Sequence, residues 1–221
     1  MRLLPLFPLP VVLFPGVPLP LHIFEPRYRT MLADCMEGDR RFGILYHPDD
    51  ADELALEPGH VGCVAHVESA QPMPDGRSNI IVTGEERFAL ARFVPSTHPY
   101  HVGEVRDYGD EPGSSPDLSD LAAQVRATFE RVGRAARTIS DDPDPLPSLP
   151  DDAALLSFTI ASMIDLDVRA RQQLLVSRSP AGRLREVGAL LTTAVNALES
   201  RAALHTRAKS NGNGPHPTAS A

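Results

Sequence analysis

Residues 4–32 read LPLFPLPVVLFPGVPLPLHIFEPRYRTML, an apolar stretch that is interrupted by prolines. Its prolines at positions 5, 8, 10, 15, 18 and 20 exclude a membrane helix and the apolar core of a signal peptide. Short strands are predicted at Leu3–Phe7, Val11–Phe14 and Leu19–Phe24, with a turn at Pro15-Gly16. Because each proline removes a backbone donor, we expect these strands at sheet edges or bends.

The end of this stretch predicts a helix that begins at Pro26, since proline suits the first helical position. Four residues then share one face: Tyr28, Met31, Leu32 and Cys35. Further strands are predicted at Phe42–His47, Val61–Ser69, Ile80–Thr83, Arg87–Val94 and Val102–Tyr108, with a hairpin turn at Pro74-Asp75-Gly76-Arg77. Many short strands with one short helix indicate a small closed or half-closed β-barrel.

The sequence changes character after a polar stretch, Asp107–Asp117, which is typical of a linker. Helices are predicted from Leu118 to Ile139, over Ala153–Leu166, over Val168–Val176 and from Ser179-Pro180 onward. The predicted fold class is α+β: a barrel over residues 1–110, a helical bundle over residues 117–205 and a disordered tail over residues 206–221.

Composition excludes several classes of function. Lys+Arg is 21 against 29 for Asp+Glu, a formal net charge of -8, and no basic run is present, which disfavours nucleic-acid binding. Two cysteines are too few for a disulfide framework, so reduced thiols in a cytoplasmic protein are expected. No stretch approaches the roughly 18–20 uninterrupted apolar residues that span a bilayer, so no membrane partner is expected.

The chain lacks the usual signatures of catalysis. No phosphate-binding G-x-x-x-x-G-K-[ST] loop and no G-x-S-x-G elbow occur. The one lysine, Lys209, lies in the predicted tail, so a Ser-Lys dyad has little support. Cys35 lies on the apolar face of a helix, where a thiolate is disfavoured. We therefore expect no enzymatic activity and no cofactor; a hydrolase with scattered catalytic residues stays an alternative.

Two histidine clusters resemble metal sites without meeting the geometric requirements. In a strand, His60 and His66 share one face while Cys63 points to the other, and zinc requires about four ligands. His98 and His101 lie three residues apart, which places them on opposite sides of an extended chain. No metal site is predicted, and Cys63 is expected to be a small buried thiol.

The opening stretch resembles the start of the N-terminal, substrate-binding domain of the Lon protease family. RFGILY (41–46), GCVAHVESAQPMPDGRSNIIVTGEERFAL (62–90) and YHVGEV (100–105) are similar to later blocks of that family in the same order. RQQLLVSRSPAGRLREVGALL (171–191) is similar to its helical part. The resemblance covers residues 2–204 and implies a PUA-like barrel followed by a helical bundle. The chain resembles the stand-alone Lon N-terminal-domain proteins, which lack the ATPase and protease modules.

The resemblance implies that this chain binds unfolded or tagged protein segments and works as an adaptor or chaperone-like factor in protein quality control, with a separate protease or chaperone as a possible partner. Three aromatic residues are the candidate peptide contacts: Phe14, Phe24 and Tyr28. The other family-motif positions are expected to be mostly structural: Pro8, Pro15, Glu25, Arg27, Gly43, Asp75, Gly76, Arg77, Gly84, Arg87 and Phe88. The alternatives are a small-molecule sensor and, less favoured by the acidity, RNA binding.

Overall fold

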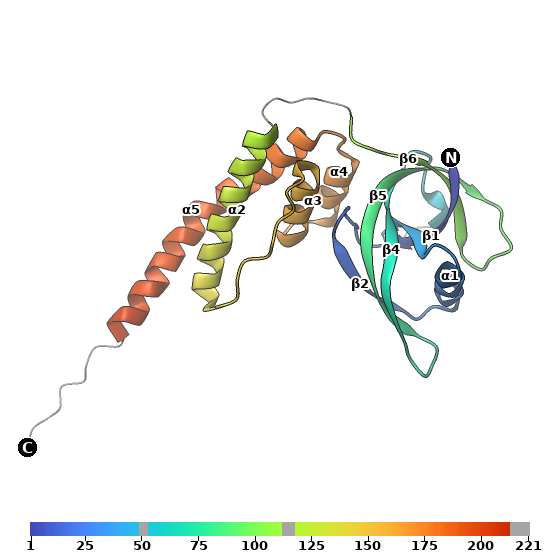
Figure 1. Ribbon diagram of the computed structural model, residues 1–221, viewed down its shortest axis with the longest axis horizontal. Helices are drawn as coiled ribbons and strands as arrows, with labels where there is room; N and C mark the ends of the chain where they lie inside the picture. The colour runs from blue at the N-terminus through green and yellow to red at the C-terminus, as the bar shows by residue number, and fades with distance from the viewer. Residues whose placement is uncertain (49–52, 112–117, 213–221) are drawn as a thin grey trace, which may run out of the picture.

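The computed structural model describes residues 1–48, 53–111 and 118–212, and Figure 1 shows strands and helices gathered in two adjoining parts. The strands are β1 (Arg2–Leu9), β2 (Pro18–Ile23), β3 (Arg41–Tyr46), β4 (Val61–Pro72), β5 (Ser78–Val94) and β6 (His101–Asp107). The helices are α1 (Pro26–Glu37), a short 3-10 helix η1 (Glu53–Ala55), α2 (Leu118–Ser140), α3 (Ala153–Met163), α4 (Val168–Val176) and α5 (Pro180–Gly212).

The sheet closes on itself through β5. The strand order is β2-β5-β4-β3-β1-β6, and β6 also pairs with β5. Five strands therefore form a ring, while β2 pairs with β5 outside it. This arrangement confirms the predicted α+β fold with a small barrel.

A single strand, β5, replaces the two strands predicted at Ile80–Thr83 and Arg87–Val94. Its pairing with β4 changes register between Cys63 and Ala65, a bulge that bends the strand without ending it. The first half of β5 pairs with β2 outside the ring, and the second half pairs with β6 and closes the ring.

Among the described residues, Phe88 is the one aromatic side chain of the hydrophobic cluster inside the barrel, and it is fully buried. A Cβ on Gly43 would lie 2.6 Å from the Phe88 Cζ atom, and a Cβ on Gly62 would lie 2.7 Å from it. Glycine at both positions makes room for the ring. The remaining interior is aliphatic: Leu4, Leu6, Leu45, Val64, Leu90 and Val105.

The proline-rich segment between β1 and β2 is irregular rather than a strand at Val11–Phe14, and it lies against β5 through an isolated bridge between Pro15 and Gly84. The Gly16 N–H donates to the Gly84 carbonyl at 2.8 Å. A Cβ on Gly84 would lie 2.1 Å from the Phe14 carbonyl oxygen. This close backbone approach ties the segment to the middle of β5.

Strand β2 forms the edge of the described sheet, and its prolines deprive that edge of donors. The Gly84 N–H donates to the Val17 carbonyl at 3.1 Å, so the backbone groups of alternate residues from Val17 onward face β5. The backbone nitrogens of Pro18 and Pro20 therefore face away from β5. Because these nitrogens carry no hydrogen, the free edge of β2 offers few donors to another strand.

The helices pack beside the barrel, with α2 and α5 side by side in an arm that points away from it (Figure 1). The two helices run parallel, since Val125 meets Gly188 near one end and Asp141 pairs with Lys209 near the other. Helix α5 continues to Gly212, so residues 206–212 are helical where a disordered tail was predicted. Residues 213–221 of that tail and residues 112–117 of the predicted linker lie outside the described residues.

Helix α1 buries the four residues that its periodicity predicted, and α4 has its predicted bounds. One hydrophobic core cluster includes residues of both parts, from Phe42 in the barrel to Leu184 in α5. The division into a barrel unit and a helical unit stays a prediction. No helix in the described ranges is both long and apolar enough to cross a lipid bilayer.

Candidate functional site

A pocket of about 420 Å³ opens where the ends of β1 and β2 meet the start of α1. A volume of this size falls within the ~300–1,000 Å³ range of small-ligand pockets and accepts a large side chain. Residues from five segments line it: Phe7, Pro8, Leu9, Pro10, Leu21, His22, Ile23, Phe24, Glu25, Arg27, Tyr28, His47 and Glu53.

Buried apolar side chains form the inner wall of the pocket. Phe7 and Tyr28 lie with ring centroids 3.9 Å apart, and each is less than a tenth exposed. Phe24 lies at the mouth, where 59% of it is exposed. An exposed phenylalanine beside an apolar wall is a surface that gains from contact with an apolar partner.

Charged groups form the opposite wall. Arg27 donates from Nη1 and Nη2 to the two oxygens of Glu53, both at 2.7 Å, and from Nε to Glu25 at 3.0 Å. His101 Nε2 lies 2.9 Å from Glu53. Burial acts to raise the pKa of Glu53, but the hydrogen bonds and charges of Arg27 and His101 together outweigh burial and lower it. Because Arg27 faces two carboxylates, this wall carries net negative charge.

His47 is a buried residue of the inner wall. Its side chain is 6% exposed, and its Nε2 has no hydrogen-bond partner among the described residues. The backbone N–H of His47 donates to the Leu9 carbonyl at 2.8 Å, which fixes the residue to the end of β1. Less than 1 Å² of the Nε2 atom is accessible, so the pocket is lined by other atoms of His47.

The structure brings two of the three candidate aromatic residues to this pocket, Phe24 and Tyr28, and places the third elsewhere. Phe14 is 1% exposed and stacks on Phe158 of α3, with ring centroids 5.3 Å apart. Phe14 therefore packs the helices against the barrel and lies outside this pocket, and its contact with a ligand stays a prediction. The irregular path of the proline-rich segment turns it inward.

The remaining motif residues serve different parts of the fold. Asp75 and Arg77 pair with each other at the exposed tip of the β4–β5 hairpin, where Gly76 has a φ of 82°. Pro8 lines the pocket, and Pro15 forms an isolated bridge with Gly84. The hairpin pair is local, so it does not fix the hairpin to the barrel.

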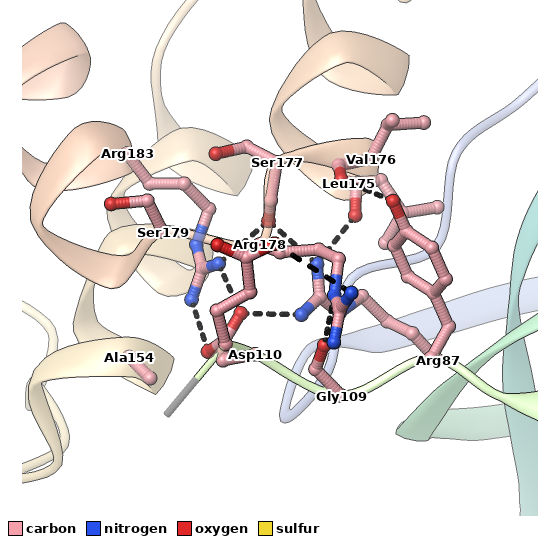
Figure 2. A network of polar contacts seen from close by, with 12 residues as sticks. Arg87, Gly109, Asp110, Ala154, Leu175, Val176, Ser177, Arg178, Ser179 and Arg183 are labelled. Carbon is pink, nitrogen blue, oxygen red and sulfur yellow. Dashed lines mark hydrogen bonds and ion pairs between the residues drawn. The ribbon is translucent and has the colours of Figure 1, made fainter. Parts of the chain in front are cut away.

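Arg87 lies at the joint between the barrel and the helices, which Figure 2 shows from close by. Its Nη1 donates to the carbonyls of Leu175 and Ser177, each at 2.7 Å, and its Nη2 to Asp110. Arg183 donates to the two Asp110 oxygens at 2.6 and 2.8 Å. Two buried guanidinium groups thus share one carboxylate.

The second positive charge of this joint is balanced by the end of α4. Leu175 and Ser177 lie at its C-terminus, where unpaired carbonyls carry partial negative charge. Burial would raise the pKa of Asp110, but the hydrogen bonds and charges of the two arginines lower it overall. Arg183 also lies over the Phe158 ring at 4.2 Å. The joint is therefore both polar and tightly packed.

Four residues of these constellations gave no signal in the sequence: His47, Glu53, Asp110 and Arg183. Glu53 follows residues 49–52, which the structure does not describe, and Asp110 lies in a stretch typical of a linker. Both carboxylates are recognised only through arginines that lie far away in the sequence.

Comparison with known proteins agrees with this geometry. The family "ATP-dependent protease La (LON) substrate-binding domain" matches residues 3–193. The chain belongs to this family. It is 30% identical over 203 residues to Lon protease 2 of Herpetosiphon aurantiacus, covering 89% of this chain and 24% of that protein. It is 27% identical to Lon protease 1 of Myxococcus xanthus, covering 93% of this chain and 26% of that protein.

Two solved structures share the fold. The Lon N-terminal domain protein from Xanthomonas campestris matches with a TM-score of 0.61 and 26% identity, covering 86% of this chain and 98% of that one. The N-terminal domain of Mycobacterium avium complex Lon protease matches with a TM-score of 0.65 at 17% identity, over 86% and 98% of the two chains. The chain thus corresponds to the substrate-binding part of Lon, and it spans about a quarter of the curated relatives.

Proposed function

We propose that this chain binds exposed segments of unfolded protein chains through the pocket beside Phe24. The observation that carries the proposal is the pocket itself: an apolar inner wall, an exposed phenylalanine at the mouth and a volume suited to one large side chain. Membership of the Lon substrate-binding domain family supports the same assignment.

A neighbouring hollow supports a polypeptide as the ligand. It has a volume of about 350 Å³, shares Leu21 and His22 with the main pocket and includes Ile81, which is 47% exposed. Successive side chains of an extended segment could occupy the two hollows. Since the free edge of β2 has few donors, recognition would rest on side chains rather than on strand addition.

The direct test is binding of a model protein that has been reduced and alkylated so that it cannot fold. We expect the chain to bind this form and not the folded form of the same protein. Phe24→Ala should weaken binding about tenfold, which corresponds to ~1.4 kcal/mol of lost apolar contact. Leu3→Ala is the matched control, because Leu3 is 63% exposed and lies outside the pocket.

Equal binding of the folded and unfolded forms, or equal effects of the two substitutions, would contradict the proposal. Neither substitution removes a buried side chain, so both variants should keep the thermal stability of the parent protein.

We further propose that the chain presents bound segments to a separate protease or chaperone and does not cleave them itself. Burial raises the pKa of Cys35 to about 12, and Cys63 is fully buried, so neither thiol is suited to attack a peptide bond. Lys209 pairs with Asp141 at the far end of α5. Incubation with the unfolded protein, with and without ATP, should therefore yield no fragments.

A further inference from the structure

An exposed carboxylate, that of Glu25, lies at the mouth of the pocket. Its side chain is 41% exposed, and it directly follows Phe24, which is 59% exposed. Its Oε2 accepts from Arg27 Nε at 3.0 Å, and no described residue donates to its Oε1. The other carboxylate of the lining, Glu53, is 24% exposed in its side chain and accepts bonds at both oxygens. Glu25 is therefore the acidic group that a bound segment would meet first.

The arginine of the lining cannot receive an anion without losing bonds that it already makes. Nε, Nη1 and Nη2 of Arg27 all donate to Glu25 or Glu53. An anionic group would have to compete with these carboxylates for the guanidinium. A cationic group can instead bond to the open oxygen of Glu25 while every bond of Arg27 stays intact.

The start of α1, beside Glu25, offers an anion little. A helix N-terminus attracts negative groups through its free N–H groups and its dipole. In α1 the first residue is Pro26, which carries no N–H. The N–H groups of Tyr28 and Arg29 donate to the Glu25 carbonyl at 3.1 and 3.0 Å. The Glu25 side chain does not cap the helix, so its charge stays available at the mouth of the pocket.

We infer that the pocket selects apolar segments that carry lysine or arginine beside the inserted side chain, and that Glu25 sets this selection. The inference rests on the proposed function, since it names the class of segment that the same pocket binds. The apolar wall accepts the inserted side chain, and Glu25 distinguishes cationic from anionic flanks. The neighbouring hollow has no acidic residue, lysine or arginine in its described lining, so the selection concerns the flank at the main pocket.

The test uses short acetylated and amidated peptides around one Leu-Phe-Leu core, flanked on both sides by lysine, by glutamine or by glutamate. Their affinities for the whole chain are measured by fluorescence anisotropy at physiological salt, where charges farther apart than ~8 Å are largely screened. We expect the lysine peptide to bind about twofold to fivefold more tightly than the glutamine peptide, the range of an exposed ion pair. The glutamate peptide should bind more weakly than either.

A fourth peptide separates the pocket from the overall charge of the chain, which is -8. It has the composition of the lysine peptide, but its lysines are moved to the two ends and glycine and serine flank the core. General attraction acts on both lysine peptides alike, whereas contact with Glu25 requires a cation beside the inserted side chain. The fourth peptide should therefore bind about as tightly as the glutamine peptide.

Two substitutions assign the selection to one carboxylate. Glu25→Gln should bring the affinities of the lysine, glutamine and glutamate peptides within about twofold of one another, because Glu53 and Arg27 then balance each other in the lining. Glu186→Gln is the matched control: it removes the same charge from an exposed position on α5, outside the pocket. The lysine preference should survive in this variant.

Each outcome decides the inference. Equal affinities of wild type for the lysine and glutamate peptides, or for the two lysine peptides, overturn it and leave the proposed function intact. A lysine preference that survives Glu25→Gln in full, or that Glu186→Gln also removes, overturns the role of Glu25. If wild type binds neither the peptides nor the unfolded protein, the proposed function fails as well. The wild-type comparisons need no variant, so a folding defect in Glu25→Gln would not remove the test.

Discussion

Arg183 and Asp110 form a two-point ion pair across 73 residues of sequence, with Nη to Oδ distances of 2.6 and 2.8 Å. Arg183 is fully buried, and Asp110 is 24% exposed in its side chain. Arg87 bonds to the same carboxylate from β5. The carboxylate of Asp110 therefore pairs with one arginine from the barrel and one from the helices (Figure 2).

We predict that Asp110→Asn lowers the free energy of unfolding by about 3 kcal/mol, because removing one partner leaves buried charges uncompensated. Urea denaturation followed by circular dichroism measures this change. Glu199→Gln is the control: its ion pair with Arg131 is exposed, with 48% and 41% of the two side chains accessible. That change should be below about 1 kcal/mol. A loss for Asp110→Asn no larger than the control would show that the joint does not need the carboxylate.

The stabilisation by Asp110 should also depend on pH. Arg183 and Arg87 overcome the effect of burial and lower the pKa of Asp110 below its unfolded value of about 3.9. The stabilisation by ionised Asp110 is therefore fully present above about pH 4 and is lost as the pH falls through the folded pKa. The stability difference between wild type and Asp110→Asn should be constant from pH 7 to 5 and shrink below pH 4. Urea unfolding at each pH measures it, and a difference that grows in acid would contradict the assignment.

Local patterns allowed much of the barrel and the helices to be predicted. Helix α1 could be placed because Pro26 marks its start and its four buried residues recur at helical spacing. The sequence predicts the two halves of β5 as strands but not their continuity, since the bulge between the Cys63 and Ala65 pairings depends on β4. Sequence periodicity reports which residues alternate and carries no information about the partner strand.

The candidate site was predicted only in part, for a physical reason. Phe14 and Phe24 occur in the same proline-broken apolar segment, and the sequence does not distinguish them. The structure buries Phe14 against Phe158 and leaves Phe24 exposed, because α3 packs over one of the two positions. Asp110 was hidden in the same way: its two arginines arrive from β5 and α5 only when the chain folds.

Gly84 offers a test of the close approach between β5 and the proline-rich segment. We predict that Gly84→Ala lowers the free energy of unfolding by about 3 kcal/mol, because the new Cβ would lie 2.1 Å from the Phe14 carbonyl oxygen. Backbone atoms cannot rotate away as a side chain can. For Gly109→Ala, where nothing lies within 4 Å of the added Cβ, the change should stay within about 0.5 kcal/mol. Equal urea midpoints for the two variants would contradict the close approach of the proline-rich segment to β5 at Gly84.

A matched pair of substitutions separates the two roles of the aromatic residues. Phe14→Leu should lower the free energy of unfolding by about 1–2 kcal/mol, because it removes the stacked contact with Phe158 inside the core. It should leave the affinity for an unfolded, alkylated protein unchanged, since Phe14 lies outside the pocket. Phe24→Leu should do the reverse, because Phe24 is exposed at the pocket mouth and contributes little to the core.

Thermal unfolding and binding anisotropy, measured on the same preparations at a temperature where each variant is folded, provide the comparison. The two substitutions remove the same atoms, so differences in chemistry cannot explain opposite effects. Weaker binding by folded Phe14→Leu would mean that the proline-rich segment opens to admit the ligand at Phe14. Stability lost in Phe24→Leu would mean that its ring packs against the protein rather than against a partner.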